Sequence, residues 1–322
     1  MYDLIIVGGG PAAVAAGVYA ARKKLKTLLI TESFGGQSLV SDNIENWIGT
    51  TVITGFDLAK NLEEHLRAQE SIEIKMPEKV TAISEIPCTD GKRPCDFEVE
   101  TNTGTRYQTK AVIVTSGSRR RRLGIPGEDK FEGKGVAFCS TCDAPIFSGK
   151  RVAVVGGGNA GLEAVVDLFP YATEIYLFHR GGELKGDPIT QEEIRNNPKV
   201  KIILNAETQE VIGDKFVTGL RYKDTKTGES KELALDGVFV EIGAVPNSEI
   251  VKGLAELNQF GEIVIDHKTS ATSKPGIFAA GDVTDEMYKQ NNISAGDGIT
   301  AALSAYSNLL GLKKQSPAVE RV

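Results

Sequence analysis

The sequence predicts an α/β protein with two Rossmann-like, three-layer nucleotide-binding domains. Two segments carry this prediction, because each joins a short apolar run, a cluster of glycines and an alanine-rich helical stretch: DLIIVGGGPAA (3–13) and RVAVVGGGNAG (151–161). A second apolar run follows each segment, TLLIT at 27–31 and EIYLF at 174–178. Strand, glycine turn, helix and strand open a βαβ unit, and this opening occurs twice in the chain.

Composition and charge narrow the class of protein. The chain has 322 residues, enough for two domains, and its 41% apolar and 25% charged residues are typical of globular proteins. A net charge of -6 argues against a nucleic-acid partner. No apolar run approaches the about 20 residues of a membrane helix. The start MYDLIIVGGG has no signal-peptide pattern, so we expect a cytoplasmic protein without a membrane partner.

The domain boundaries stay open from the residues alone. SGSRRRRLGIPG (116–127) and GAVPN (243–247) are rich in residues that break helices and strands. One arrangement inserts a domain of 117–244 into a domain made of 1–116 and 245–322. The alternative is two consecutive domains, and hydrophobic periodicity does not separate the two.

The first glycine motif predicts a dinucleotide site. Gly8 permits a tight turn, Gly10 lets the backbone approach a pyrophosphate, and Pro11 and Ala12 open the helix whose N-terminus faces the phosphates. Glu32 follows the second apolar run, at the position where an acid binds a ribose hydroxyl.

The second glycine motif predicts a nicotinamide site with a weaker continuation. After its second strand, FHRGGELK (178–185) offers no acid for a ribose hydroxyl, and Arg180 is the candidate partner of a 2′-phosphate. The alternative is an unused site. The candidate nicotinamide contacts are Gly156, Gly158, Asn159, Ala160 and Arg180.

The stretch FCSTCD (138–143) predicts a redox pair. A zinc site needs about four ligands, and the remaining Cys88 and Cys95 are spaced unlike a second such pair. A permanent disulfide closing so small a loop adds little stability. Cys139 and Cys142 therefore form the candidate dithiol, and Asp143 is the candidate group for moving its proton. No metal is expected.

Two features have more than one interpretation. Cys88 and Cys95 flank an expected hairpin turn, where they either pair or remain free thiols. The run Arg119–Arg122 is either a solvated face between domains or a docking patch for an acidic partner such as ferredoxin.

With these residues in place, the chain resembles the low-molecular-weight thioredoxin reductases, which are class II pyridine nucleotide-disulfide oxidoreductases. TESFGGQ (31–37) and the C-terminal part look closest to archaeal thioredoxin reductases and to the flavoprotein subunit of alkyl hydroperoxide reductase. The matching stretches cover nearly the whole chain in the family's order: GGGPAA (8–13), FGGQ (34–37), IENW (44–47), LGIPG (123–127), CSTCD (139–143), GGGNAG (156–161), GAVPN (243–247), GD (281–282) and YKQ (288–290).

The resemblance implies FAD in the first domain, the inserted arrangement and a homodimer. In this family pattern Gly8, Gly10 and Glu32 hold the ADP half of FAD, and Asp282 binds the ribityl chain. Other positions line the flavin or complete its site: Pro11, Ala12, Gly36, Gln37, Asn46, Val80, Gly281, Lys289, Gln290 and Asn291.

The implied activity is that of a FAD-dependent thioredoxin-disulfide reductase. Electrons pass from NAD(P)H via FAD to the Cys139–Cys142 pair and on to a thioredoxin-like protein. Cys142 is the implied contact of the flavin and Cys139 the nucleophile toward the partner. The pair cannot face both at once, so the inserted domain is expected to swivel about joints near 116–118 and 243–247.

The electron donor is the open point of this resemblance. NADPH-dependent members carry H-R-R-x-x-x-R after the second strand, whereas here Gly181 replaces the second arginine and Lys185 stands near the last. Losing one arginine weakens 2′-phosphate binding, because charge-assisted bidentate bonds are strong. The donor is therefore NADPH or NADH. The alternatives are a nicotinamide-independent reductase fed by ferredoxin or another flavin, and a thiol oxidase or small-disulfide oxidoreductase.

Overall fold

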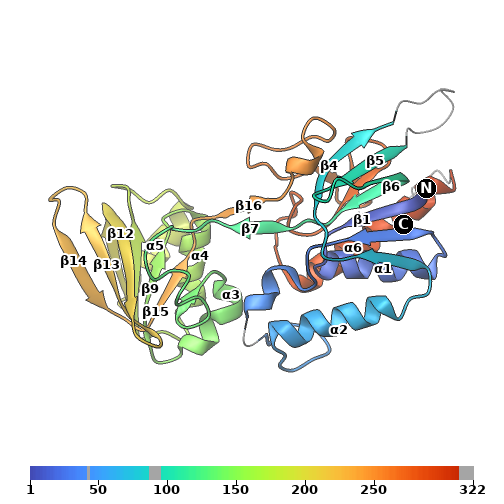
Figure 1. Ribbon diagram of the computed structural model, residues 1–322. Coiled ribbons are helices and arrows are strands. Elements are labelled where there is room, and N and C mark those ends of the chain that lie inside the picture. The colour runs from blue at the N-terminus through green and yellow to red at the C-terminus, as the bar shows by residue number, and fades with distance from the viewer. Residues whose placement is uncertain (42–43, 87–95, 312–322) are drawn as a thin grey trace, which may run out of the picture. The chain divides into compact units, whose positions relative to one another are not determined.

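The computed structural model describes residues 1–41, 44–86 and 96–311 (Figure 1). The chain forms two compact units. The first unit consists of Met1–Leu39, Trp47–Arg119 and Val245–Val322, and the second of Val40–Asn46 and Arg120–Ala244.

A nine-stranded sheet forms the middle layer of the first unit. Its parallel part follows the order β3-β2-β1-β6-β19, in which neighbours come from distant parts of the sequence. β18 and β17 extend it antiparallel beyond β19, and β4 and β5 extend it beside β6. The strands are β1 (Tyr2–Val7), β2 (Thr27–Ile30), β3 (Ile72–Lys75), β4 (Val80–Glu85), β5 (Phe97–Thr101), β6 (Arg106–Val114), β17 (Ile265–Asp266), β18 (Ala271–Thr272) and β19 (Ile277–Ala279).

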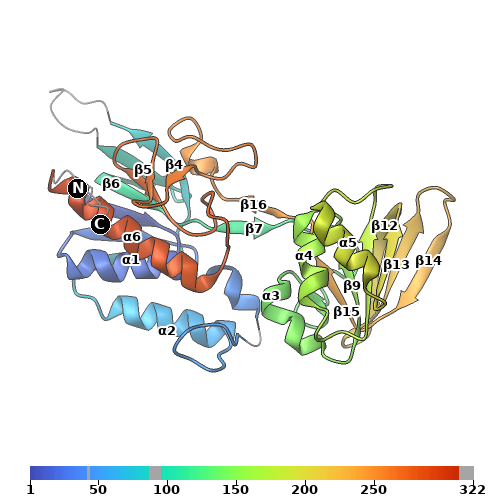
Figure 2. The ribbon, with the colours of Figure 1, turned by 180° about the vertical axis from the view of Figure 1, so that it is seen from behind.

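Three helices cover one face of this sheet, α1 (Pro11–Arg22), α2 (Gly55–Arg67) and α6 (Asn291–Leu309). α1 and α6 lie side by side (Figure 1, Figure 2), and small residues allow the approach, since a Cβ atom at Gly298 would overlap the backbone of Ala12. The side chains of β1 alternate between the two faces of the sheet. Leu4 and Ile6 face these helices, whereas Ile5 and Val7 face a second core that includes residues of β4, β5 and the 3₁₀ turn η3 (Glu249–Val251).

The second unit repeats the layered plan on a smaller scale. Its five-stranded parallel sheet has the order β11-β10-β9-β15-β8, and a three-stranded antiparallel sheet covers one face. The strands are β8 (Val136–Ala137), β9 (Arg151–Val155), β10 (Glu174–His179), β11 (Val200–Leu204), β12 (Ala206–Gly213), β13 (Val217–Asp224), β14 (Ser230–Ala234) and β15 (Gly237–Val240). The helical segments are α3 (Ser140–Asp143), η2 (Ala144–Phe147), α4 (Asn159–Asp167) and α5 (Pro188–Asn196).

The parallel strands of the first sheet and the parallel sheet of the second unit confirm the predicted α/β fold with two Rossmann-like domains. The longer segment of the second unit lies within the sequence of the first. Among the described residues, every helix is too short or too polar to cross a membrane.

Two strands pair where the chain passes from one unit to the other, β7 (Ser118–Arg120) and β16 (Ala244–Pro246). They form a two-stranded ribbon. Its base is fastened twice: the Ser116 hydroxyl donates to the Asn247 carbonyl at 2.7 Å, and the Asn247 amide donates to the Ser116 carbonyl at 2.8 Å. The longer segment of the second unit therefore begins and ends at this ribbon.

The arginine run falls on this ribbon and just beyond it. Arg119 pairs with Glu249 at 2.8 Å, and Arg122 pairs with Glu132 at 2.6 Å and lies over the Phe138 ring. These partners come from each arginine's own unit, which leaves fewer unpaired charges for the docking patch considered from the sequence.

Candidate active site

The first glycine motif forms an open cradle between β1 and α1. A Cβ atom at Gly8, whose φ is +129°, would overlap the carbonyl oxygen of Thr115, and one at Gly9 would overlap that of Ser33. Gly10 has no protein atom within 4 Å of that position, and it caps α1 without a side-chain hydrogen bond. The turn is thus closed toward the protein and open toward a ligand, as a pyrophosphate requires.

Polar side chains from distant segments meet beside this cradle. The Gln37 amide donates to Asp282 at 3.2 Å and to Ser118 at 3.1 Å, and the Ser38 hydroxyl donates to Asn291 at 3.0 Å. The carboxylate of Glu32, two residues after the end of β2, lies 3.4 Å from Lys79 Nζ. The fold brings most of the predicted flavin-domain residues to one region of the first unit.

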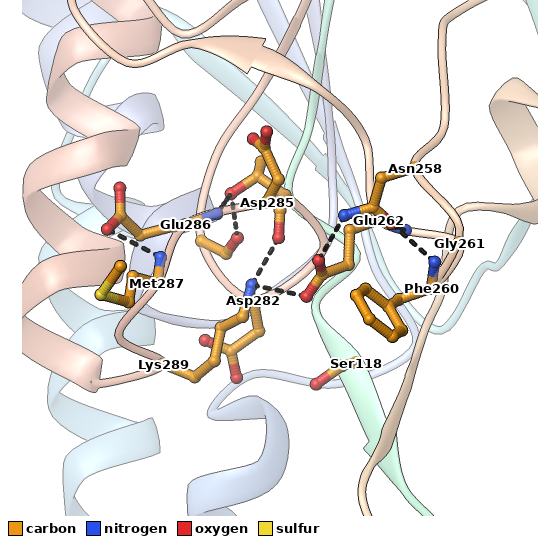
Figure 3. Close-up of polar contacts among 12 residues, drawn as sticks. Ser118, Asn258, Phe260, Gly261, Glu262, Asp282, Asp285, Glu286, Met287 and Lys289 are labelled. Carbon is orange, nitrogen blue, oxygen red and sulfur yellow. Dashed lines mark hydrogen bonds and ion pairs between the residues drawn. The ribbon is translucent and has the colours of Figure 1, made fainter. Parts of the chain in front are cut away.

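The side chain of Lys289 makes polar contacts within the first unit. Its ammonium donates to the carbonyl of Thr284 and lies 3.2 Å from Glu262, whose carboxylate accepts from Asn258 at 2.7 Å. Figure 3 shows this arrangement near Asp282.

The other residues predicted for the flavin site lie on several different elements. A Cβ atom at Gly281 would lie 3.2 Å from that of Ala12, and Gly36 begins the 3₁₀ turn η1 (Gly36–Val40). Val80 is buried at the start of β4, and Gln290 is the N-cap of α6. Asn46 belongs to the segment grouped with the second unit.

The second glycine motif has the same geometry. A Cβ atom at Gly156 would overlap the carbonyl oxygen of Glu241, and one at Gly161 would overlap that of Gly156. Gly158 faces open space and caps α4 without a side-chain hydrogen bond. Asn159, a predicted contact, uses its side-chain oxygen to accept the backbone N–H of Asp187 at 2.8 Å.

The segment after β10 shows what surrounds the position of the missing second arginine. His179 packs against the glycine turn, and a Cβ atom at Gly181 would lie 2.8 Å from its Nε2 atom. That atom is buried without a hydrogen-bond partner among the described residues. Burial, together with the charges of Lys185 and Arg180, lowers the pKa of His179. The lowered pKa disfavours the charged form of His179, and the exposed Arg180 follows it directly in the sequence.

Cys139 and Cys142 form a disulfide across the single turn of α3, with Cα atoms 5.4 Å apart. Asp167 on α4 anchors this turn, since its carboxylate accepts from the hydroxyls of Ser140 at 2.8 Å and Thr141 at 3.3 Å. Cys88 and Cys95 lie outside the described residues.

Two carboxyl groups beside the disulfide have raised pKa values. Burial raises the pKa of Asp143 to about 6, against the opposing charge of Arg120. Burial raises the pKa of Glu241 to about 7, against Arg120 and a hydrogen bond from the Ser140 backbone. The sequence did not predict Glu241 or Asp167 as site residues. Glu241 directly follows the buried strand GVFV, and this position at the carboxyl edge of a parallel sheet is typical of functional residues.

Each unit contains a dinucleotide-type glycine cradle, and the second unit also contains a Cys-x-x-Cys disulfide, so the chain combines two nucleotide-type turns with a dithiol. The family profile described as pyridine nucleotide-disulphide oxidoreductase matches residues 2–301, and the chain belongs to this family.

Individual relatives agree with this assignment. The chain is 43% identical over 309 residues to a protein named NADH dehydrogenase of Bacillus subtilis (strain 168), and 44% identical over 310 residues to the F subunit of alkyl hydroperoxide reductase from Pseudomonas putida. Each match covers 96% of this chain but 59% and 58% of those relatives, so the chain spans about three fifths of their length.

Solved structures match over nearly the full length of both chains. Thioredoxin reductase from Streptococcus pyogenes MGAS5005 has a TM-score of 0.88 at 32% identity, covering 97% of this chain and 99% of that one. Thioredoxin reductase of T. acidophilum has a TM-score of 0.64 at 36% identity, covering 96% and 99%. The resemblance noted from the sequence is confirmed.

Proposed function

We propose that this chain is a thioredoxin-disulfide reductase that passes electrons from NAD(P)H via FAD to the Cys139–Cys142 pair and on to a thioredoxin-like protein. The observation that carries the proposal is the disulfide itself, which lies in the same unit as the second glycine cradle and beside an acid of raised pKa. Thioredoxin reductases among the solved structures support the choice of partner.

The residues of the first unit fit FAD, whose bound flavin supplies the two-electron redox chemistry. Gly10 and the N-terminus of α1 would receive the pyrophosphate, and Glu32 the ribose hydroxyls. Asp282 would bind the ribityl chain, oriented by the Gln37 amide. Lys289, held by Glu262, would lie near the isoalloxazine ring.

The chain's own residues carry out the exchange with the partner. The Cys139 thiolate attacks one sulfur of the partner's disulfide, and the second sulfur leaves as a thiolate. Cys142 then loses its proton and attacks Cys139, which releases the partner's first sulfur. Asp143, next to Cys142, accepts and returns the proton. Two electrons and two protons leave the dithiol and arrive on the partner.

The donor is tested by anaerobic titration of the flavin-loaded protein with NADPH and with NADH. We expect both to bleach the flavin, with a modest preference for NADPH, because Gly181 offers no charge to a 2′-phosphate and Arg180 and Lys185 remain. Reduction of thioredoxin is then measured with the better donor. If neither nicotinamide bleaches the flavin at millimolar concentration, the donor assignment is wrong, and a ferredoxin-fed reductase takes its place.

Two further properties are inferred from the family resemblance. The protein is proposed to act as a homodimer in the cytoplasm, and light scattering of the FAD-loaded protein measures the first of these directly. A monomer that turns over thioredoxin at full rate would contradict it.

A further inference from the structure

Residues 184–187, which come after β10 in the second unit, lie against the second glycine turn. The backbone N–H of Lys185 donates to the Gly157 carbonyl at 2.7 Å. Two residues further on, the backbone N–H of Asp187 donates to the side-chain oxygen of Asn159, the first residue of α4, at 2.8 Å. The 184–187 segment is therefore attached both to the turn and to the helix that follows it.

The contact between this segment and α4 leaves no space for a side chain at Gly186. A Cβ atom there would overlap Leu162 Cδ1 and would lie 2.9 Å from the side-chain oxygen of Asn159. Leu184 is buried in the same core cluster as Leu162. The absence of a side chain at one position and burial at the other thus let the segment approach α4 closely.

One side chain of α5 fixes the path of the 184–187 segment. The Gln191 amide donates to the Gly186 carbonyl at 2.8 Å, and its nitrogen lies 3.5 Å from the Leu184 carbonyl oxygen. These two carbonyl groups belong to the neighbours of Lys185 on either side. Because an amide donor shared between them restrains the backbone at both places, Gln191 determines where the Lys185 side chain leaves the segment.

Lys185 brings a positive charge to the second glycine turn. Burial and, after it, the charges of Lys185 and Arg180 lower the pKa of His179, whose ring packs against Gly157. Both cations therefore lie near that ring. Gly158 opens the same turn toward a ligand, since its Cβ position has no protein atom within 4 Å. Two positive charges beside this turn favour a nucleotide that carries an additional phosphate.

We propose that Gln191 is a positioning residue for the choice of electron donor: by holding residues 184–187 against the turn, it keeps the Lys185 ammonium where it can pair with the 2′-phosphate of NADPH. This role rests on the proposed use of NAD(P)H at the second glycine cradle. A lysine on an unrestrained backbone pairs less well with a phosphate, because pairing then has to order the backbone as well as the side chain. NADH has no 2′-phosphate, so its binding depends less on Gln191.

The test compares two nucleotides that differ only in the 2′-phosphate. FAD-loaded protein is titrated calorimetrically with NADP⁺ and with NAD⁺, because these oxidised forms bind without reducing the flavin. Gln191→Met keeps the length of the side chain and a good helix former but removes the amide. Gln209→Met is the matched control, because Gln209 lies on β12 and there loses a 3.2 Å hydrogen bond from the Ser230 hydroxyl.

We expect Gln191→Met to weaken NADP⁺ about threefold more than NAD⁺, which is the scale of one poorly positioned surface ion pair. Lys185→Met should weaken NADP⁺ roughly tenfold more than NAD⁺, because a charged hydrogen bond is lost. In the double variant the ratio of the two affinities should equal that of Lys185→Met alone, since Gln191 then has no charge to position. Gln209→Met should keep the ratio of the unaltered protein.

An equal loss of both nucleotides in Gln191→Met, or losses that multiply in the double variant, would make Gln191 a general support of the fold and overturn the proposed role. If Gln191→Met does not fold, Gln191→Asn, which withdraws the amide by one methylene group, decides by the same ratio. If the unaltered protein binds both nucleotides but reduces no thioredoxin, the proposed function fails, while the affinity ratios still decide the role of Gln191. If it does not bind NADP⁺, that role is wrong.

Discussion

Asp143 makes the stability of the protein depend on pH in a direction opposite to most surface acids. Its folded pKa of about 6 exceeds the ordinary value of 3.8 because burial disfavours the carboxylate. The stabilising contribution is therefore present at low pH and lost as pH rises from about 4 to about 6. We expect Asp143→Asn to gain about 1–2 kcal/mol in unfolding free energy, relative to the unaltered protein, between pH 4.5 and pH 7.5. Thermal unfolding followed by circular dichroism at both pH values measures the difference.

Asp187 provides a control of opposite sign. It caps α5 by accepting the backbone N–H of Thr190 at 2.9 Å, and this bond lowers the pKa of its carboxyl. Its stabilising contribution is present at neutral pH and lost as pH falls through the lowered pKa. The loss in Asp187→Asn should therefore stay constant between pH 4.5 and pH 7.5, which both lie above the ordinary value of 3.8, and it should shrink only at lower pH. The same pH response in both variants would show that the burial of Asp143 is not the cause.

Two glycines near the start of α4 have different roles: one is needed for packing, and the other leaves room for a ligand. A Cβ atom at Gly161 would overlap a backbone carbonyl, whereas one at Gly158 meets no protein atom within 4 Å. We expect Gly161→Ala to destabilise the protein by about 2 kcal/mol, as overpacking does. Gly158→Ala should keep the melting temperature nearly unchanged but weaken NADPH and NADH by roughly tenfold, because the added methyl group occupies the pyrophosphate's approach. Calorimetric titration of both variants measures the affinity.

The sequence predicts these turns because their constraint is local: a strand, a tight turn and a helix N-terminus dictate the residue types within a dozen positions. It predicts Cys139, Cys142 and Asp143 for the same reason. Glu241 and Asp167 escape prediction because they reach the disulfide turn only through the neighbouring β15 and through α4. Likewise, the segment His179–Gly182 does not predict that His179 packs against the glycine turn. From the sequence, Gly181 is only the position where an arginine is missing.

For the whole molecule, the ribbon of β7 and β16 is the place where the swivel inferred from the sequence would turn. Gly117 and Gly243 sit on either side of it with φ values of +64° and +97°, a conformation that costs other residues roughly 1 kcal/mol or more. Side-chain space is not the obstacle, since the nearest atom to a Cβ at Gly243 is Arg121 Cδ at 4.0 Å. An alanine there acts on backbone torsion alone.

If turnover requires torsion at this joint, Gly243→Ala should slow thioredoxin reduction several-fold while leaving nicotinamide affinity and thiol alkylation unchanged. Gly228→Ala is the matched control, because Gly228 has a φ of +78° and open space in the turn between β13 and β14, away from the ribbon. Both variants place an alanine at a positive φ, so we expect the melting temperature to drop in both. Turnover should drop only in Gly243→Ala. Full turnover in Gly243→Ala would mean that the catalytic cycle does not use this glycine as a hinge, because the strain would then have no kinetic consequence.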